Sequence, residues 1–207
     1  MKTQFGFKSA ACALAMLPLG MAAQADVATL DGDWVSQACE VRPQQGPDGS
    51  VTEWWLTRKI EMRNGRIAAE FTTYAGPGCG FALQRLDFAG TVEEVGASAV
   101  VNGAIEANLT IDEYVRFTPL AQGFADFMNS APSGSCGAAE WQVGQTQDVL
   151  EGGCALLGLN PNEPTIEYEV LALLGDQLFF GARPVDGSFI TSPDKRPSAL
   201  LVPLSRE

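Results

Sequence analysis

Polar and apolar residues alternate along this chain in short runs that are typical of β-strands. From Leu30 onward, runs of about five to ten residues are separated by Gly, Pro, Asn and Asp clusters. Ranges 67–74 and 105–111 alternate strictly, which predicts half-buried strands. Asn64-Gly65 between two runs predicts a hairpin turn. Further candidate strands are 33–42, 54–63, 81–90, 91–102, 113–117, 145–150, 165–174, 177–181 and 198–203.

One segment has the period of a helix instead. Thr118 can cap its start, Pro119 suits the first turn, and Leu120, Phe124 and Phe127 follow at positions i, i+4 and i+7. These residues predict a short amphipathic helix. Its apolar stripe either packs as ordinary core, the interpretation we favour, or covers the mouth of a cavity.

So many strands in one exported domain must protect their edges. A closed or nearly closed barrel and a two-sheet sandwich are the two architectures that do so. The predicted class is therefore all-β with one short helix. Inward residues of a barrel with about eight strands line either a packed interior or a ligand cavity.

The first residues resemble a secretory signal peptide. Two lysines precede an apolar run over 10–21, which is followed by the small-residue triplet Ala23-Gln24-Ala25. A membrane-spanning helix needs roughly 20 apolar residues, and this run is shorter. We therefore expect residues 1–25 to be removed, residues 26–207 to form a single domain, and no membrane anchor.

The cysteines predict disulfide bonds. Cys12 lies in the expected leader, and four cysteines remain in the exported chain, which allow three pairings. We favour Cys39 with Cys79 and Cys136 with Cys154, since each such loop stabilises by roughly 3–4 kcal/mol. A zinc site is disfavoured because the chain has no histidine and no closely spaced cysteine pair.

Charge and composition narrow the function further. The net charge of −12 is unfavourable for binding nucleic acid or an anionic membrane, and we interpret it as a solubility feature. The absence of histidine removes Ser-His and Cys-His nucleophiles and the commonest general base. Phosphate-loop, dinucleotide-binding and nucleophile-elbow motifs are also absent. We expect no enzyme, metal or cofactor, although a pair of carboxylates could still hydrolyse a glycoside.

Two arginines within predicted strands are candidate functional residues. Arg42 and Arg58 lie near Glu40 and the Trp54-Trp55-Leu56 run. If they face inward, they need partners, because a lone buried charge is costly. They form either a structural ion pair with Glu40 or a polar anchor for a ligand head group beside an apolar pocket. The candidate ligand-binding residues are Trp34, Arg42, Trp54, Arg58, Phe71, Tyr74, Phe124, Phe127 and Trp141.

Several blocks occur in a recognisable order. They include Cys39-Glu-Val-Arg42-Pro43, the long block Cys136-Gly-Ala-Ala-Glu-Trp141-Gln-Val-Gly144-Gln-Thr-Gln147-Asp148-Val149, and Gly181-Ala-Arg183-Pro184. Nearly all of the expected mature chain resembles the adenomatosis polyposis coli down-regulated domain family. That family is known in animals for a membrane-anchored Wnt antagonist.

The resemblance implies a lipocalin-like antiparallel β-barrel, or a half-open one, with an apolar cavity that engages a lipid chain. It also implies that the four cysteines match those of the family. Animal members carry two such domains and an anchor, whereas we expect one domain and no anchor here, so Wnt antagonism is not carried over. The leader and the single domain point to a bacterial periplasmic or secreted protein.

Three functions are therefore considered. The first is binding of a fatty acid or another apolar small molecule inside the barrel. The second is a protein-interaction module with a packed interior, whose partner contacts the loops at 44–53 and 129–139. The third is a carboxylate-based hydrolase.

Overall fold

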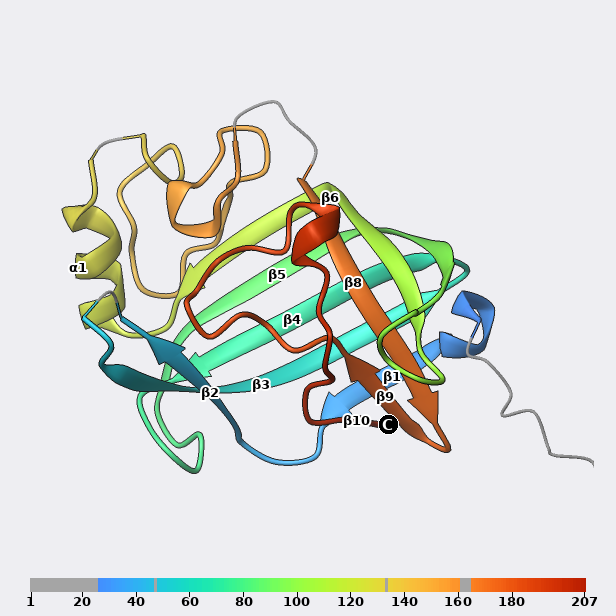
Figure 1. The fold of residues 1–207 in the computed structure, drawn as a ribbon. Helices are drawn as coiled ribbons and strands as arrows, with labels where there is room; N and C mark the ends of the chain where they lie inside the picture. Colours follow the sequence, from blue (N-terminus) through green and yellow to red (C-terminus); the bar gives the residue numbers. More distant parts are fainter. Residues whose placement is uncertain (1–25, 47, 133, 161–164) are drawn as a thin grey trace, which may run out of the picture.

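The computed structural model describes residues 26–46, 48–132, 134–160 and 165–207, and the predicted signal peptide lies outside these ranges. The described chain is mostly antiparallel β-sheet with one α-helix and three short 3-10 helices, η1–η3 (Figure 1). The elements are η1 (Val27–Leu30), β1 (Gly32–Ser36), β2 (Glu40–Gln45), β3 (Val51–Arg63), β4 (Arg66–Tyr74), β5 (Ala82–Ala97), β6 (Ile105–Pro119), α1 (Gln122–Ser130), β7 (Gln147–Asp148), η2 (Ala155–Leu157), β8 (Thr165–Leu174), β9 (Gln177–Phe180), η3 (Pro193–Lys195) and β10 (Leu204–Arg206).

The strand pairings close into a ring. Hydrogen-bonded neighbours run in the order β1-β10-β9-β8-β6-β5-β4-β3, and β3 pairs back with β1. Every pairing is antiparallel, so consecutive long strands are joined by hairpins. Strand β2 continues beside β3 beyond the part that β1 occupies, and β7 adds to β6.

Most predicted strands are present, and the best match is 165–174, which is β8. The Asn64-Gly65 turn joins β3 to β4, and both residues have positive φ (52° and 73°), as a tight hairpin turn requires. The predicted pairs 81–90 with 91–102 and 105–111 with 113–117 are instead the continuous strands β5 and β6.

Two strand predictions are wrong in their bounds. Range 33–42 is two strands, because the chain leaves the sheet between Ser36 and Glu40, where Cys39 is bonded to Cys79. Range 198–203 has only a single bridge, between Gly181 and Leu200, and the strand β10 follows it.

The helix begins later than predicted. Thr118 and Pro119 belong to β6, Ala121 is the N-cap, and α1 starts at Gln122. This shift rotates the buried face onto Ala125 and Met128. Phe124 packs partly against the core, whereas Phe127 is about half exposed (54%). The helix packs against β5 and β6, which agrees with the core-packing interpretation.

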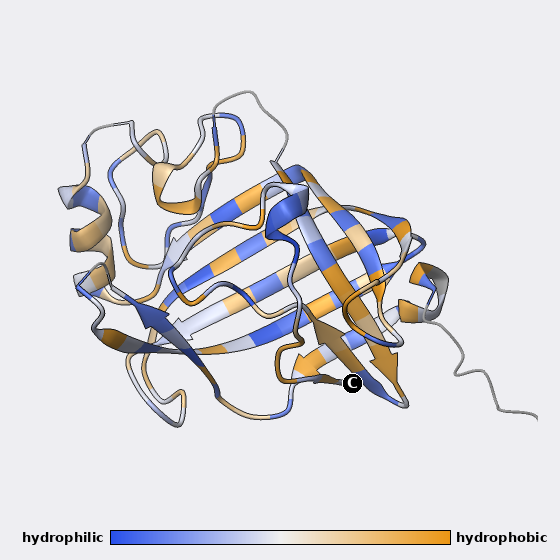
Figure 2. Ribbon diagram, in the orientation of Figure 1, coloured by the Kyte–Doolittle hydropathy of each residue, from blue (hydrophilic) through white to orange (hydrophobic). Residues whose placement is uncertain are grey.

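Inward-facing side chains of the ring form the core. Orange and blue alternate along the strands in Figure 2, as expected for a sheet with one buried face. In β6, Ile105, Ala107, Leu109 and Ile111 are buried while the residues between them are half-buried. Strands β8, β9 and β10 contribute fully buried leucines, which are Leu171, Leu178 and Leu204.

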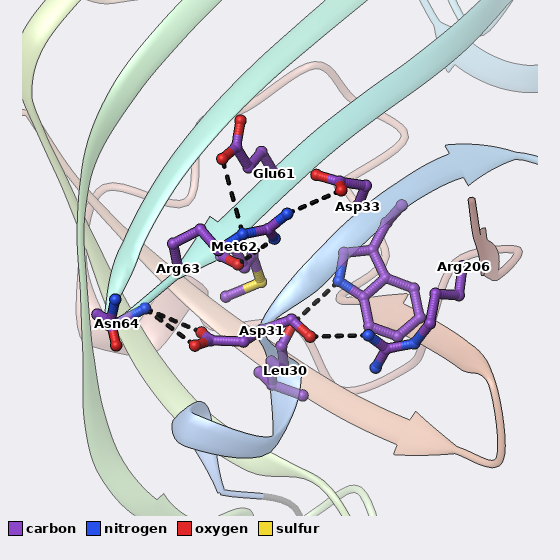
Figure 3. A network of polar contacts seen from close by, with 9 residues as sticks. Leu30, Asp31, Asp33, Glu61, Met62, Arg63, Asn64 and Arg206 are labelled. Carbon is purple, nitrogen blue, oxygen red and sulfur yellow. Dashed lines mark hydrogen bonds and ion pairs between the residues drawn. The ribbon is translucent and has the colours of Figure 1, made fainter.

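The N-terminal segment lies at one end of the ring, where η1 contacts both β3 and β5. Figure 3 shows the polar contacts that hold it there. The buried Trp34 indole donates from Nε1 to the Leu30 carbonyl oxygen at 2.9 Å. The Arg206 guanidinium lies 4.3 Å from the Trp34 ring centroid and donates to the Asp31 carbonyl. The Asn64 backbone N–H donates to the Asp31 carboxylate. Together these contacts hold η1 across the end of the ring.

Residues 182–191, which we call the covering segment, follow β9 and cross in front of the sheet (Figure 1). Two backbone hydrogen bonds hold it to strands: Gln45 N–H donates to the Val185 carbonyl and Tyr168 N–H to the Ile190 carbonyl. Arg183 adds a side-chain ion pair to β8. The segment therefore bridges β2 and β8, on opposite sides of the ring opening.

Two disulfides join Cys39 to Cys79 and Cys136 to Cys154, the pairing favoured from the sequence. The second disulfide ties together residues 131–160, which also contain Trp141 against Phe117.

Among the described residues, no helix combines the length and the apolar character needed to cross a bilayer.

Candidate functional site

Two adjoining pockets, which share six lining residues and which we call the two lobes of one cavity, lie between the inner face of the sheet and the covering segment. Its lobes measure about 260 Å³ and about 410 Å³. Both are lined by Arg42, Phe71, Leu86, Arg183, Pro184 and Gly187. Pockets for small molecules occupy about 300–1,000 Å³, so the two lobes together reach this size range.

The smaller lobe extends along β5, β6 and β8. Phe88, Ile111 and Val115 form its sheet wall, while Leu159 and Phe189 close it from the loop side. The larger lobe extends under β2 and β3, beside Trp54 and Leu56. Apolar side chains dominate both walls, so an alkyl chain or a ring system would be desolvated in either lobe.

An ion cluster of one fully buried and two half-buried side chains lies on the β8 side of the cavity. One nitrogen of Arg183, Nη2, is 2.8 Å from Glu167 Oε2 and 2.8 Å from Glu169 Oε1. Burial alone would lower the pKa of Arg183, but the two carboxylates outweigh it and raise that pKa. Burial raises the pKa of the fully buried Glu169, despite the nearby Arg183. The cluster fixes Arg183, and with it the start of the covering segment.

A second buried ion pair lies on the β3 side. Arg58 Nε is 2.9 Å from Glu40 Oε1, and Arg58 Nη2 donates to the Val202 carbonyl. Ser36 donates its hydroxyl to the same Glu40 oxygen at 2.6 Å. Only 1% of the Arg58 side chain is exposed. The hydrogen-bonding groups of Arg58 are thus paired within the protein, in the structural ion pair with Glu40 that was one of the two alternatives considered from the sequence.

Arg42 has no such partners. Its Nε is buried without a hydrogen-bond partner, and none of the ion pairs among the described residues includes it. Its guanidinium carbon lies 6.0 Å from the Phe71 ring centroid. Burial, with the positive charges of Arg183 and Arg58, lowers the pKa of Arg42 from 12.5 to about 10. The half-buried Arg42 guanidinium, which no carboxylate contacts directly, therefore lies beside both lobes.

Three of the nine predicted ligand-binding residues line the cavity, which are Arg42, Trp54 and Phe71. Trp34 does not line the cavity, because it lies at the closed end and bonds the Leu30 carbonyl. Arg58 does not line it either, because it forms an ion pair with Glu40. The Tyr74 hydroxyl is instead 3.2 Å from the Thr57 hydroxyl.

The remaining three predicted residues belong to the region of α1. Trp141 is buried edge-on against Phe117, and its Nε1 donates to the Cys136 carbonyl. Phe124 packs against the core, and Phe127 points away because the helix begins at Gln122. None of the three lines either lobe.

Sequence reasoning missed Glu167, Leu86 and the covering segment. The signal for Glu167 was present, since it shares a strand face with Leu171 and Leu173, and an acid on an inward face needs a partner. The covering segment has no periodic pattern, and only its contacts with β2 and β8 place it over the cavity.

Two acidic residues lie beside the cavity, but they do not form a paired-carboxylate site. The described residues include no group of three or more Cys, Asp or Glu side chains arranged to hold a metal ion. Glu167 and Glu169 share Arg183, but only Glu167 lines the cavity, while Glu169 is fully buried. This pair therefore does not present two carboxyl groups to a substrate in one cleft.

A β-sheet ring with a closed end and an apolar cavity under a covering segment is typical of a binding domain. The family model described as adenomatosis polyposis coli down-regulated 1 matches residues 16–155. The chain belongs to this family. The matched range contains all four disulfide cysteines and Arg42, and it ends before β8 and the covering segment. The match is therefore shorter than the resemblance noted in the sequence. Membership indicates a non-enzymatic binding or interaction domain.

Proposed function

We propose that this protein is an exported binding protein whose single domain, residues 26–207, holds a fatty acid or a similarly elongated apolar molecule. In this proposal the ring of strands works as a lipocalin-like barrel with one closed and one open end. The two disulfides support an oxidising compartment, either the periplasm or the extracellular space. The family assignment supports binding rather than catalysis.

The observation that carries the proposal is the cavity itself. It has two lobes of about 260 and 410 Å³, apolar walls and a shared central region. A domain with a fully packed interior would have only voids near the size of a water molecule. The proposed occupant gains free energy by removing its apolar surface from water, about 25 cal/mol per Å².

Denaturing extraction of the purified protein followed by mass spectrometry tests this proposal, because a bound molecule would be released and weighed. Titration of the delipidated protein with N-phenyl-1-naphthylamine, a neutral fluorescent probe, measures binding independently. We expect saturable binding, and displacement of the probe by long-chain amphiphiles. Absence of both extracted lipid and probe binding would contradict the proposal.

A blocking variant localises the site. Leu86 lines both lobes, so Leu86→Trp should fill their junction and weaken probe binding by about ten-fold or more. Leu174→Trp is the matched control, because Leu174 is 71% exposed near the β8–β9 turn and outside the cavity. Equal affinities of the two variants would place the binding elsewhere.

The second candidate is a protein-interaction module that uses the loops at 44–53 and 129–139. Val51 is 64% exposed, and the 131–140 loop forms a polar depression of about 400 Å³ beside α1. These features favour a partner at the rim. A partner that binds the Leu86→Trp variant and the Leu174→Trp control equally well would support this candidate.

A further inference from the structure

The three inward-facing arginines of the cavity region differ in their hydrogen-bond and ion-pair partners. Arg58 bonds Glu40 and a backbone carbonyl, and Arg183 contacts two glutamates at 2.8 Å each. Arg42 lies between them and has no partner for its buried Nε. A buried donor without an acceptor costs about 1–3 kcal/mol, and more when it is charged. The unpaired Arg42 Nε therefore destabilises the fold unless a bound molecule supplies a hydrogen-bond acceptor.

The position of Arg42 indicates what that acceptor is. Arg42 lines both lobes, so a molecule lying in either one reaches it. The walls next to it, Phe71 and Leu86, have no hydrogen-bonding group in their side chains. The nearby carboxylates of Glu167 and Glu169 are both in contact with Arg183 rather than with Arg42. A negatively charged group bound at the junction of the lobes would therefore be stabilised by Arg42.

We propose that the cavity selects anionic amphiphiles, with the head group bound to the guanidinium of Arg42 at the junction and the alkyl chain lying along the apolar walls. This proposal rests on the proposed function and adds the chemistry of the head group. A guanidinium accepts a carboxylate or a phosphate in a bidentate arrangement, so both are members of the selected class. A neutral head group, such as an alcohol or an ester, offers an acceptor oxygen but no negative charge to balance the guanidinium of Arg42.

Two ligands of equal chain length test the selection. Dodecanoate and 1-dodecanol are compared by displacement of N-phenyl-1-naphthylamine from the wild-type protein at pH 8. At this pH the carboxyl is ionised and Arg42, with a pKa of about 10, is still charged. We expect dodecanoate to bind at least about ten-fold more tightly than dodecanol, because only the carboxylate forms a hydrogen bond to Arg42 in which both groups are charged. Dodecyl phosphate, run alongside, shows which anion is preferred.

Variants assign the selectivity to Arg42. Arg42→Met should abolish the difference between the dodecanoate and dodecanol affinities, and Arg42→Lys should keep part of that difference. Arg85→Met is the matched control, since it removes the same charge from β5 at a residue outside both lobes. Circular dichroism and dodecanol binding show that each variant is folded.

The outcomes separate the two proposals. Equal wild-type affinities for dodecanoate and dodecanol would overturn the head-group inference and leave the proposed function standing. A preference that survives in Arg42→Met would overturn it as well. If neither ligand displaces the probe, and the probe itself does not bind, it is the proposed function that fails.

Discussion

Arg42 and Arg58 lie on neighbouring strands, and the sequence presents them in nearly the same way. The register of β2 and β3 separates them. Glu40 lies opposite Leu56, so Arg58, two residues along the same face, is its diagonal neighbour. Arg42 lies opposite Trp54, whose indole offers no acceptor for a guanidinium. One arginine is thereby part of the framework and the other faces the cavity.

The Arg58–Glu40 pair gives a stability prediction at this scale. Arg58→Met should destabilise the protein by about 3–5 kcal/mol, because it leaves the Glu40 carboxylate buried without its partner. Urea unfolding followed by tryptophan fluorescence measures the change. Arg63→Met is the control, since its pair with Asp33 is largely exposed and such pairs contribute about 0–1 kcal/mol. Similar losses in both variants would contradict the buried-pair assignment.

Strands β5 and β6 illustrate what a local pattern misses at the scale of elements. Each was predicted as two strands, with the boundaries after Gly90 and at Asp112. In the structure these boundaries lie at a bulge, where Ala89 pairs with Tyr114 and Gly90 with Ile111. A Cβ at Gly90 would collide with the Thr110 carbonyl oxygen, so glycine permits the close approach.

The Cys136–Cys154 disulfide is the element-scale feature with the clearest consequence. It closes an 18-residue separation around Trp141, in a region with little regular structure. The double variant Cys136→Ser/Cys154→Ser should lose about 2–4 kcal/mol, mainly because the unfolded chain gains conformational freedom. Chemical unfolding in non-reducing buffer tests this. A midpoint equal to that of the wild type would show that the bond contributes no stability.

At the scale of the whole molecule, the two ends of the ring differ. Trp34, Leu30 and Arg206 seal one end, whereas the other is spanned by the covering segment, which is held by few backbone hydrogen bonds. Regions with few buried contacts open at a lower free-energy cost than core strands. In the proposed function, a ligand would enter beneath the covering segment without disturbing the sealed end.

This asymmetry predicts where a ligand changes hydrogen exchange. Binding of dodecanoate should slow amide exchange most strongly in residues 182–191 and in β2, since these surround the cavity. We expect amides near the buried Trp34 in β1 to exchange by global opening. Their exchange should therefore slow by no more than the overall gain in stability, about 2.7 kcal/mol at 100 times the dissociation constant. Hydrogen–deuterium exchange with mass spectrometry measures both. Protection centred on β1 would contradict entry at the covered end.

The sequence by itself determined the features that depend on local periodicity or on counting. Burial of one sheet face has a period of two residues, so the alternating ranges 67–74 and 105–111 could be recognised directly. The even number of cysteines outside the leader and the ordered blocks around them indicated two disulfides and the family. Tertiary structure alone decided the start of α1 and the course of the covering segment. It also decided which inward arginine is left unpaired, because Arg42 meets Arg183 only when β2 and the segment after β9 pack over the same cavity. Contacts between residues so far apart in the chain leave no periodic trace in the sequence.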